Sequence, residues 1–186
     1  MRIQTSEILP HDAYEARRAE IRARALEEKR PRRVHLDPAL TFLFENAITL
    51  RYQVQEMVRA ERMSRAADIQ HEVDTYNEVL GGPGEVGCAL LIELTDPAER
   101  DAKLRAWRRL PEHLYARLED GRKVRPLYDP RQVGDDRLSS VQYLRFPVGG
   151  AAPVAIGCDL QEIAGEAVLT AEQRAALTSD LQASSA

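Results

Sequence analysis

Polar and apolar residues alternate with the period of an α-helix in the first part of the chain. Within residues 10–29, Tyr14, Ile21 and Ala25 recur on one face, as residues on the core-facing side of a helix do. The segment begins with a proline, which is favoured at the first helical position, and Pro31 should end the helix. The pattern therefore predicts one amphipathic helix here.

Two further helices are predicted before residue 82. The first should begin at Asp37 and Pro38, because aspartate is a common N-cap and proline suits the first turn, and should reach about Met63. Its apolar stripe comprises Leu43, Ala47, Leu50, Val54 and Met57. The next helix should run from Ser64 to the glycine-rich stop at Gly81, and its buried face comprises Ile69, Val73, Tyr76 and Leu80. We expect the three helices to pack as an antiparallel bundle.

The pattern changes to that of strands and turns after this stop. Residues 86–94 form a dense apolar run that predicts a strand, and residues 97–109 predict a helix with a basic exposed side. The remaining predicted elements are a hairpin of residues 113–119 and 123–128, a second hairpin of residues 141–148 and 153–158, and a last helix over about 171–181.

This order of elements predicts an α+β fold, in which an N-terminal antiparallel bundle of three helices packs on a C-terminal, mainly antiparallel sheet. We interpret residues 1–186 as a single domain. Within it, residues 1–82 form the helical part and residues 83–160 the strand-rich part, which includes the helix at about 97–109. Residues 161–186 form the C-terminal helix and tail.

Composition excludes several classes of protein. The chain is 44% hydrophobic and 30% charged, which is too apolar for a disordered tail and too charged for a membrane protein. Two cysteines without a C-x-x-C motif exclude a disulfide scaffold, and we expect a cytoplasmic location. Acidic and basic segments alternate, so a broad basic face for nucleic acid is not favoured, although the basic helix keeps this alternative open.

A polar stripe along the helix predicted over residues 37–63 is the most unusual feature. On a helical wheel its members fall within about 40° of one line. They are Glu45, Thr49, Tyr52, Glu56 and Arg59, with Gln53 at the margin. On the neighbouring helices, Glu72 lies at the rim of the buried face, and Arg17 and Arg18 flank the apolar stripe. In an antiparallel bundle the glutamates could meet the arginines, since buried charges must be paired.

Three interpretations of this stripe remain open, namely a solvated helix face, a structural ion-pair network, and a ligand or metal site. A ferritin-like di-iron site needs Glu-x-x-His pairs, yet none of Glu45, Glu56 and Glu72 is followed by histidine three positions later. A self-contained di-iron centre is therefore disfavoured. A mononuclear site, or one shared with a partner, stays open.

Two other features are interpreted as structural. Residues 82–87 match G-x-G-x-x-G, but the dinucleotide fingerprint follows a strand and opens a helix, whereas here a helix precedes and a strand follows. Cys88 should face inward on its strand, while Cys158 ends a strand and is expected to be more accessible. If their strands are neighbours, the two thiols could form a redox pair.

Several short segments spread over most of the chain carry a resemblance to a known family. They are Phe44-Glu45-Asn46, Gln53, Glu56-Met57, Arg59, Glu61, Glu72, Tyr76-Asn77 and Val141-Gln142-Tyr143-Leu144-Arg145-Phe146. In these residues the chain resembles an uncharacterised bacterial family, domain of unknown function 3501. Proteins that resemble it are often encoded beside rubrerythrin and an iron–sulfur oxidoreductase. The resemblance thus implies a redox or peroxide-stress setting and a rubrerythrin-like or iron–sulfur partner.

The stripe and the resemblance together predict a polar site between the helices. Its candidate residues are Glu45, Asn46, Tyr52, Gln53, Glu56, Arg59, Glu72, Tyr76, Asn77, Arg17 and Arg18, with Glu45, Glu56 and Glu72 as candidate metal ligands. The leading hypothesis is a cytoplasmic accessory protein that acts with such a partner. The alternative is an enzyme or metal-binding protein that uses the helix carboxylates. The cofactor is open, as is the oligomeric state, for which a homodimer is one alternative.

Overall fold

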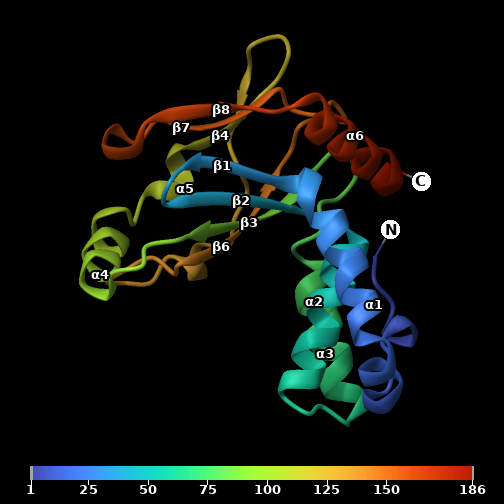
Figure 1. Cartoon of the computed structure of the whole chain (residues 1–186). Coiled ribbons are helices and arrows are strands. Elements are labelled where there is room, and N and C mark those ends of the chain that lie inside the picture. The colour runs from blue at the N-terminus through green and yellow to red at the C-terminus, as the bar shows by residue number, and fades with distance from the viewer. Residues whose placement is uncertain (1, 186) are drawn as a thin grey trace.

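The computed structural model describes residues 2–185 and confirms an α+β fold with helices in the N-terminal part and two antiparallel sheets, the first of which takes its first two strands from between the first two α-helices (Figure 1). Three helices stand together at one side of the molecule, α1 (His11–Lys29), α2 (Ala47–Ala60) and α3 (Ala66–Asn77). The apolar faces of α2 and α3, with Ile3 and Val79, form a small core of Ile3, Leu50, Val54, Val58, Val73 and Val79. The antiparallel bundle expected from the helical spacing therefore exists, with a shorter second helix.

Two four-stranded antiparallel sheets make up the rest of the core. The first sheet has the order β1–β2–β3–β6, formed by β1 (Arg33–Asp37), β2 (Leu40–Glu45), β3 (Val86–Ile92) and β6 (Val141–Phe146). The second sheet has the order β5–β4–β7–β8, formed by β5 (Lys123–Val124), β4 (Leu114–Arg117), β7 (Ala155–Cys158) and β8 (Gly165–Val168).

Short helices surround these sheets. They are α4 (Pro97–Ala106), α5 (Leu110–His113) and α6 (Ala171–Ser185), together with the 3₁₀ turns η1 (Thr5–Glu7), η2 (Arg30–Arg32), η3 (Pro130–Gln132) and η4 (Gln161–Ile163). Figure 1 shows α4 at one end of the sheets and α6 at the other, beside the upper end of the bundle. The basic helix expected near residue 97 is confirmed, and the Asp96 side chain caps it by accepting from the Glu99 N–H at 2.7 Å.

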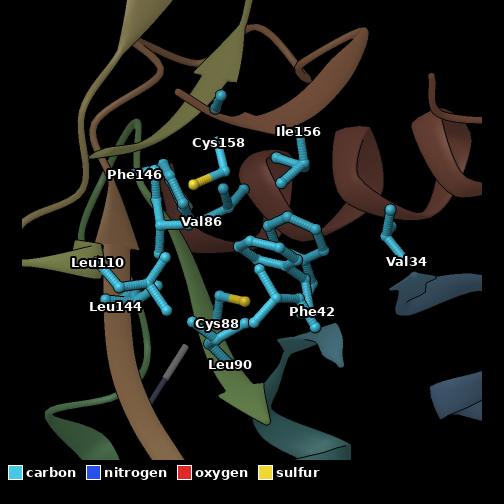
Figure 2. Packing of buried hydrophobic residues seen from close by; sticks show 14 of the residues in the cluster. Val34, Phe42, Val86, Cys88, Leu90, Leu110, Leu144, Phe146, Ile156 and Cys158 are labelled. Carbon is cyan, nitrogen blue, oxygen red and sulfur yellow. The ribbon is translucent and has the colours of Figure 1, made fainter. Parts of the chain in front are cut away.

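The main hydrophobic core lies between the two sheets (Figure 2). Phe42, Cys88 and Leu144 project into it from the first sheet, and Ile156 and Cys158 from the second. Every residue of β2 is buried, because one face of the first sheet packs on the second sheet while the bundle covers the other face at the end where β2 runs into α2. A strand that is covered on both sides reads as a continuous apolar run rather than an alternating one.

That continuous run explains the main error in the expected elements. The helix predicted from Asp37 to Met63 is wrong over residues 37–46, because residues 33–45 form a β-hairpin with Pro38 in its turn. Leu43 fits the helical spacing of the later apolar residues, but the segment 40–45 is Leu-Thr-Phe-Leu-Phe-Glu, rich in strand-forming aromatic residues. The helix α2 begins only after Asn46, whose side chain caps it.

The C-terminal strands bring two further corrections. The hairpin of residues 113–119 and 123–128 is confirmed by the β4–β5 pair. Residues 141–148 and 153–158 do not form a hairpin, because β6 belongs to the first sheet and β7 to the second. The edge strand β8 has no counterpart in the predicted elements.

The expectation that Cys158 is accessible is wrong, because the residue is only 2% exposed. The strands that carry the two cysteines belong to different sheets and are not neighbours.

The glycine-rich stop is confirmed as a turn between α3 and β3. The path of the chain just before this turn explains why β3 has a glycine at position 87. The segment 78–82, called here the crossing segment, passes over β3 so closely that a Cβ atom on Gly87 would lie 2.0 Å from the carbonyl oxygen of Val79. Only glycine permits this approach. The crossing segment therefore lies directly on the face of the first sheet that the bundle covers.

Replacement of Gly87 by alanine should destabilise the fold, because the added methyl group collides with backbone that cannot swing away. We expect a loss of about 2–3 kcal/mol in the free energy of unfolding, measured by urea denaturation. Gly82→Ala is the matched control, since its Cβ would meet only the flexible Glu85 carboxylate at 3.6 Å, and it should change stability by less than about 0.5 kcal/mol. Equal effects of the two substitutions would contradict the close crossing.

Candidate functional site

The candidate site lies on the face of the first sheet that the bundle covers. Glu45 pairs with Gly87 in β3, and Gly87 pairs with Arg145 in β6. Residues directly opposite in an antiparallel ladder share a face, so this row is turned away from the hydrophobic core, which takes Phe44 and Cys88 from the same strands. Glu45 is thus a strand residue, and its predicted place on a helix with Glu56 is wrong.

Glu45 and Gly87 of this row line a cavity of about 260 Å³, which lies between β2, the start of α2, the crossing segment and α6. We call it the Glu45 pocket, after the residue that defines it. Its polar lining comprises Glu28, Arg32, Glu45, Asn46, Glu85, Ser179, Asp180 and Ser184, and its apolar lining includes Phe44, Leu80 and Leu177. Four carboxylates and one guanidinium group therefore surround a small, partly apolar space.

Arg32 organises one wall of the pocket. Its Nε and Nη2 atoms donate to the two oxygens of Asp180 at 2.7 and 2.8 Å, and its Nη1 donates to the Glu28 backbone carbonyl at 2.7 Å. The same Nη1 lies 2.8 Å from the Glu28 carboxylate. Bidentate pairing of this kind fixes both partners in position, so η2, α1 and α6 are tied together by one buried arginine.

Asn46 joins this network to the start of α2. Its Nδ2 donates to Glu28 at 2.8 Å and to Asp180 at 3.2 Å, while its Oδ1 accepts from the backbone N–H groups of Ile48 and Thr49, each at 3.0 Å. Asn46 is therefore satisfied at both ends of its side chain. The helix N-terminus at the pocket is closed by the protein itself rather than left open to an anion.

Glu45 is the exception in this network. The residue is only 8% exposed, and its Oε2 atom is buried without a hydrogen-bond partner among the described residues. Burial raises the pKa of the carboxyl group, an effect that Lys29, the Thr49 hydroxyl and Arg32 oppose. A buried polar atom without a partner destabilises a fold by about 1–3 kcal/mol. The pocket wall thus holds an acidic group of which one oxygen has no partner in the described chain.

A second cavity, of about 660 Å³, lies on the other side of the crossing segment, between α3, β6 and residues 127–132. We call it the Tyr76 groove, and its lining includes Glu72, Tyr76, Asn77 and Tyr143. Leu80 lines both cavities. The two spaces are therefore separated only by the crossing segment.

Two phenols and a glutamate with shifted pKa values meet in the Tyr76 groove. Burial and the neighbouring Tyr143 raise the pKa of Tyr76 to about 12, while a hydrogen bond to the Gln53 side chain acts in the opposite direction. Burial and the charge of Glu61 raise the pKa of Glu72. Burial raises the pKa of Tyr143, and Glu45 adds to the effect. Tyr143 thus links the groove electrostatically to the Glu45 pocket.

Glu56 has a different environment inside the bundle. Arg18 donates to its two oxygens at 2.8 and 2.9 Å, and the hydroxyl group of the fully buried Tyr14 donates to it as well. These hydrogen bonds, led by those from Arg18, lower the pKa of Glu56 to about 2. Glu56 is a saturated, ionised carboxylate that ties α2 to α1.

The other predicted site residues stabilise local structure. Arg59 pairs with Glu15, the exposed Arg17 with Glu20 at 3.5 Å, and the Tyr52 ring lies 5.7 Å from the Lys29 ammonium. Asn77 pairs with both backbone groups of Ile3, at 2.9 and 3.0 Å. The structure thus brings together Glu45 with Asn46, and Gln53 and Glu72 with Tyr76. It does not bring together Glu45, Glu56 and Glu72.

Several residues of the site had no signal in the sequence. Arg32 and Asp180 are far apart in the chain and meet only through the fold, and Glu28 was one charge among many on α1. Tyr143 stood within the segment that carried the family resemblance, but nothing in that segment indicated a pairing with Tyr76. Contacts between residues so distant in sequence cannot be read from local periodicity.

Metal binding, membrane crossing and nucleic-acid binding by the basic helix can each be checked against the described residues. Within residues 2–185, no three His, Cys, Asp or Glu side chains are grouped so that they could hold a metal ion. In the same range no helix has both the length and the apolar composition to cross a bilayer. On the basic helix α4 and just beyond it, Lys103, Arg105 and Arg109 each contact an acidic side chain.

Removal of the Glu56 charge should destabilise the protein in a pH-dependent way. At pH 7, Glu56→Gln weakens the bonds to Arg18 and Tyr14, and we expect a loss of about 2 kcal/mol in the free energy of unfolding. Because the folded pKa is about 2 against an ordinary 4.5, the stabilisation is complete above about pH 4.5 and is lost as pH falls toward 2. Chemical denaturation of both proteins from pH 7 to pH 2 measures this.

The control for this experiment is Glu20→Gln, which removes an exposed carboxylate of α1 and should change stability by less than about 0.5 kcal/mol at every pH. A difference between wild type and Glu56→Gln that stays constant down to pH 2 would refute the assignment of Glu56 as an ionised, arginine-bound group.

Comparison with known proteins agrees with this fold and supplies no activity. The model of a family described as "Protein of unknown function (DUF3501)" matches residues 2–181. A search of curated proteins gives no match. A crystal structure of a novel protein of unknown function from Burkholderia pseudomallei K96243 is similar, with a TM-score of 0.88 and 28% identity over 97% of this chain and 100% of that chain. The chain therefore belongs to the DUF3501 family of proteins of unknown function.

Proposed function

We propose that this DUF3501 protein is a cytoplasmic accessory protein of a redox or peroxide-stress system, which holds a small polar ligand in the Glu45 pocket and acts beside a rubrerythrin-like or iron–sulfur partner. The proposal assigns ligand binding to this chain and electron transfer to the partner. The setting rests on the family resemblance, and the site rests on the geometry of the pocket.

One observation carries the proposal, namely the unpartnered Oε2 atom of Glu45, a residue that lines the cavity. Each of the other carboxylates in the pocket has a donor, as Asp180 has Arg32 and Glu85 has the N–H of Gly82 at 3.0 Å. Buried polar groups in folded proteins are almost always paired with protein, water or ligand. A small molecule that satisfies Glu45 would explain why the fold keeps this group.

The state of the two thiols supports the division of roles. Cys88 is fully buried and Cys158 is 2% exposed, and burial raises the pKa of both groups. Thiol chemistry requires the thiolate, and these residues sit as small apolar side chains within the core (Figure 2). A redox pair of Cys88 and Cys158 is therefore disfavoured, and the proposal leaves redox chemistry with the partner.

A second candidate function is an enzyme that uses the Tyr76 groove. Its support is the position of Glu72 beside Tyr76 and Tyr143 in the groove, together with the raised pKa of Glu72, which is typical of a carboxyl group that donates a proton. Glu72 would act as a general acid toward a substrate in the groove. The metal-binding form of this alternative has less support, because Glu56 is occupied by Arg18 and Tyr14.

Isolation of the tagged protein from its own host under gentle anaerobic conditions tests the accessory role. We expect it to carry a rubrerythrin or iron–sulfur protein in near-stoichiometric amount, identified by mass spectrometry and by iron content. A tagged copy with Asp136→Asn, which alters an exposed carboxylate remote from the pocket lining, should retain the partner and serves as the control. Repeated isolation of the protein alone would argue strongly against an accessory role.

A further inference from the structure

We propose that the Glu45 pocket is a receptor for a small alkylammonium ion, whose N–H groups donate to the carboxylate of Glu45 while its carbon chain lies against Phe44, Leu80 and Leu177. This inference rests on the proposed ligand-binding role of the pocket and names the chemical class of the ligand. Three observations support it, namely the charge of the pocket lining, the hydrogen-bond partners of its carboxylates and the size of the cavity.

The charge of the lining favours a cation. Glu28, Glu45, Glu85 and Asp180 face the pocket, and Arg32 is the cationic residue among the residues that line it. Arg32 is already bound by Asp180 and Glu28. An anionic ligand would therefore meet carboxylates without an available positive partner, whereas a cation enters a field of favourable sign.

Pairing within the pocket identifies the contact atom. Glu28 and Asp180 are held by Arg32 and Asn46, and Glu85 accepts from Gly82 and lies 3.3 Å from an Arg145 nitrogen. Among the residues that line the pocket, Glu45 alone has a buried oxygen without a hydrogen-bond partner. An ionised carboxylate only accepts hydrogen bonds, so the complementary ligand group is a donor, and a charged donor gives the stronger bond.

Lys29 acts on the charge of Glu45 without pairing with its Oε2 atom. Lys29 is the largest of the charges that favour the ionised form of Glu45. It makes no hydrogen bond to the Oε2 atom, and its Nζ atom lies 5.7 Å from the centre of the Tyr52 ring. The protein therefore places an ammonium group near Glu45 without satisfying it, and a ligand ammonium can complete the pair.

Size and lining select an organic ion rather than a metal. A water molecule occupies about 30 Å³ in the liquid, so a cavity of about 260 Å³ holds a ligand of a few heavy atoms. Metal ions need several convergent oxygen, nitrogen or sulfur ligands, and the described residues offer no such group of three. The apolar wall gives an alkyl chain a contact that a hydrated metal ion would not use.

Isothermal titration calorimetry of the full chain tests the inference, with n-butylammonium chloride as the probe. Three comparison ligands are used. Butyrate carries the opposite charge, n-butanol carries no charge, and magnesium chloride supplies an inorganic cation. We expect saturable one-to-one binding of butylammonium, with affinity at least about tenfold weaker in Glu45→Gln and unchanged in Glu20→Gln. Butyrate, butanol and magnesium should bind at least about tenfold more weakly than butylammonium.

If Glu45→Gln fails to fold, amide NMR spectra of the wild-type protein still test the inference. Butylammonium should shift the amide signals of Glu45 and Gly87, while those of Glu20 stay in place. Shifts of the same signals by butyrate, butanol or magnesium in preference to butylammonium would overturn the ligand class and leave the pocket as a binding site. Failure of every probe to shift them would overturn the inference together with the pocket's role in ligand binding, whereas loss of the partner protein alone would affect only the accessory role.

Discussion

Burial of the Glu45 carboxyl group at the end of a strand covered on both faces is the constraint on which the site depends. The inner face of β2 packs against the second sheet, and its outer face is covered where the chain turns through Asn46 into α2. The crossing segment passes directly over Gly87, which pairs with Glu45, and so covers the same part of the sheet. Because three elements converge on one strand end, the last side chain of the strand is only 8% exposed, and its chemistry is set by its neighbours.

Two glutamates show how differently the fold treats the same group. Glu56 receives two bonds from Arg18 and one from Tyr14, and its pKa falls to about 2. Glu45 is more deeply buried, lacks a partner for one oxygen, and its pKa is raised. A carboxylate that is saturated stabilises the bundle, whereas one left unsatisfied beside a cavity is typical of a binding or reacting group. This contrast supports a structural role for Glu56 and the ligand-binding role that we propose for Glu45.

The sequence predicted the helical elements better than the sheets. Helical spacing placed α1 and α3 closely, and the apolar run after Gly84 located β3, because these signals are local. The hairpin of β1 and β2 was missed because a strand buried on both faces has no alternation to distinguish it from a helix. Glu45, Asn46 and Tyr76 were found as candidates, but the reason given for Glu45, a shared helix face with Glu56, was wrong. Arg32, Asp180 and Tyr143 depend on contacts across the fold, which no local pattern encodes.

The most direct test of the central claim is a carbon-13 NMR titration of the side-chain carboxyl group of Glu45 in the unliganded protein. The account predicts that this carbon titrates above the ordinary value of 4.5, because burial of the unpartnered oxygen disfavours the charged form. In the same spectra Glu56 should titrate well below that value. A Glu45 midpoint at or below 4.5 would show a solvated or fully paired carboxylate and would contradict the account.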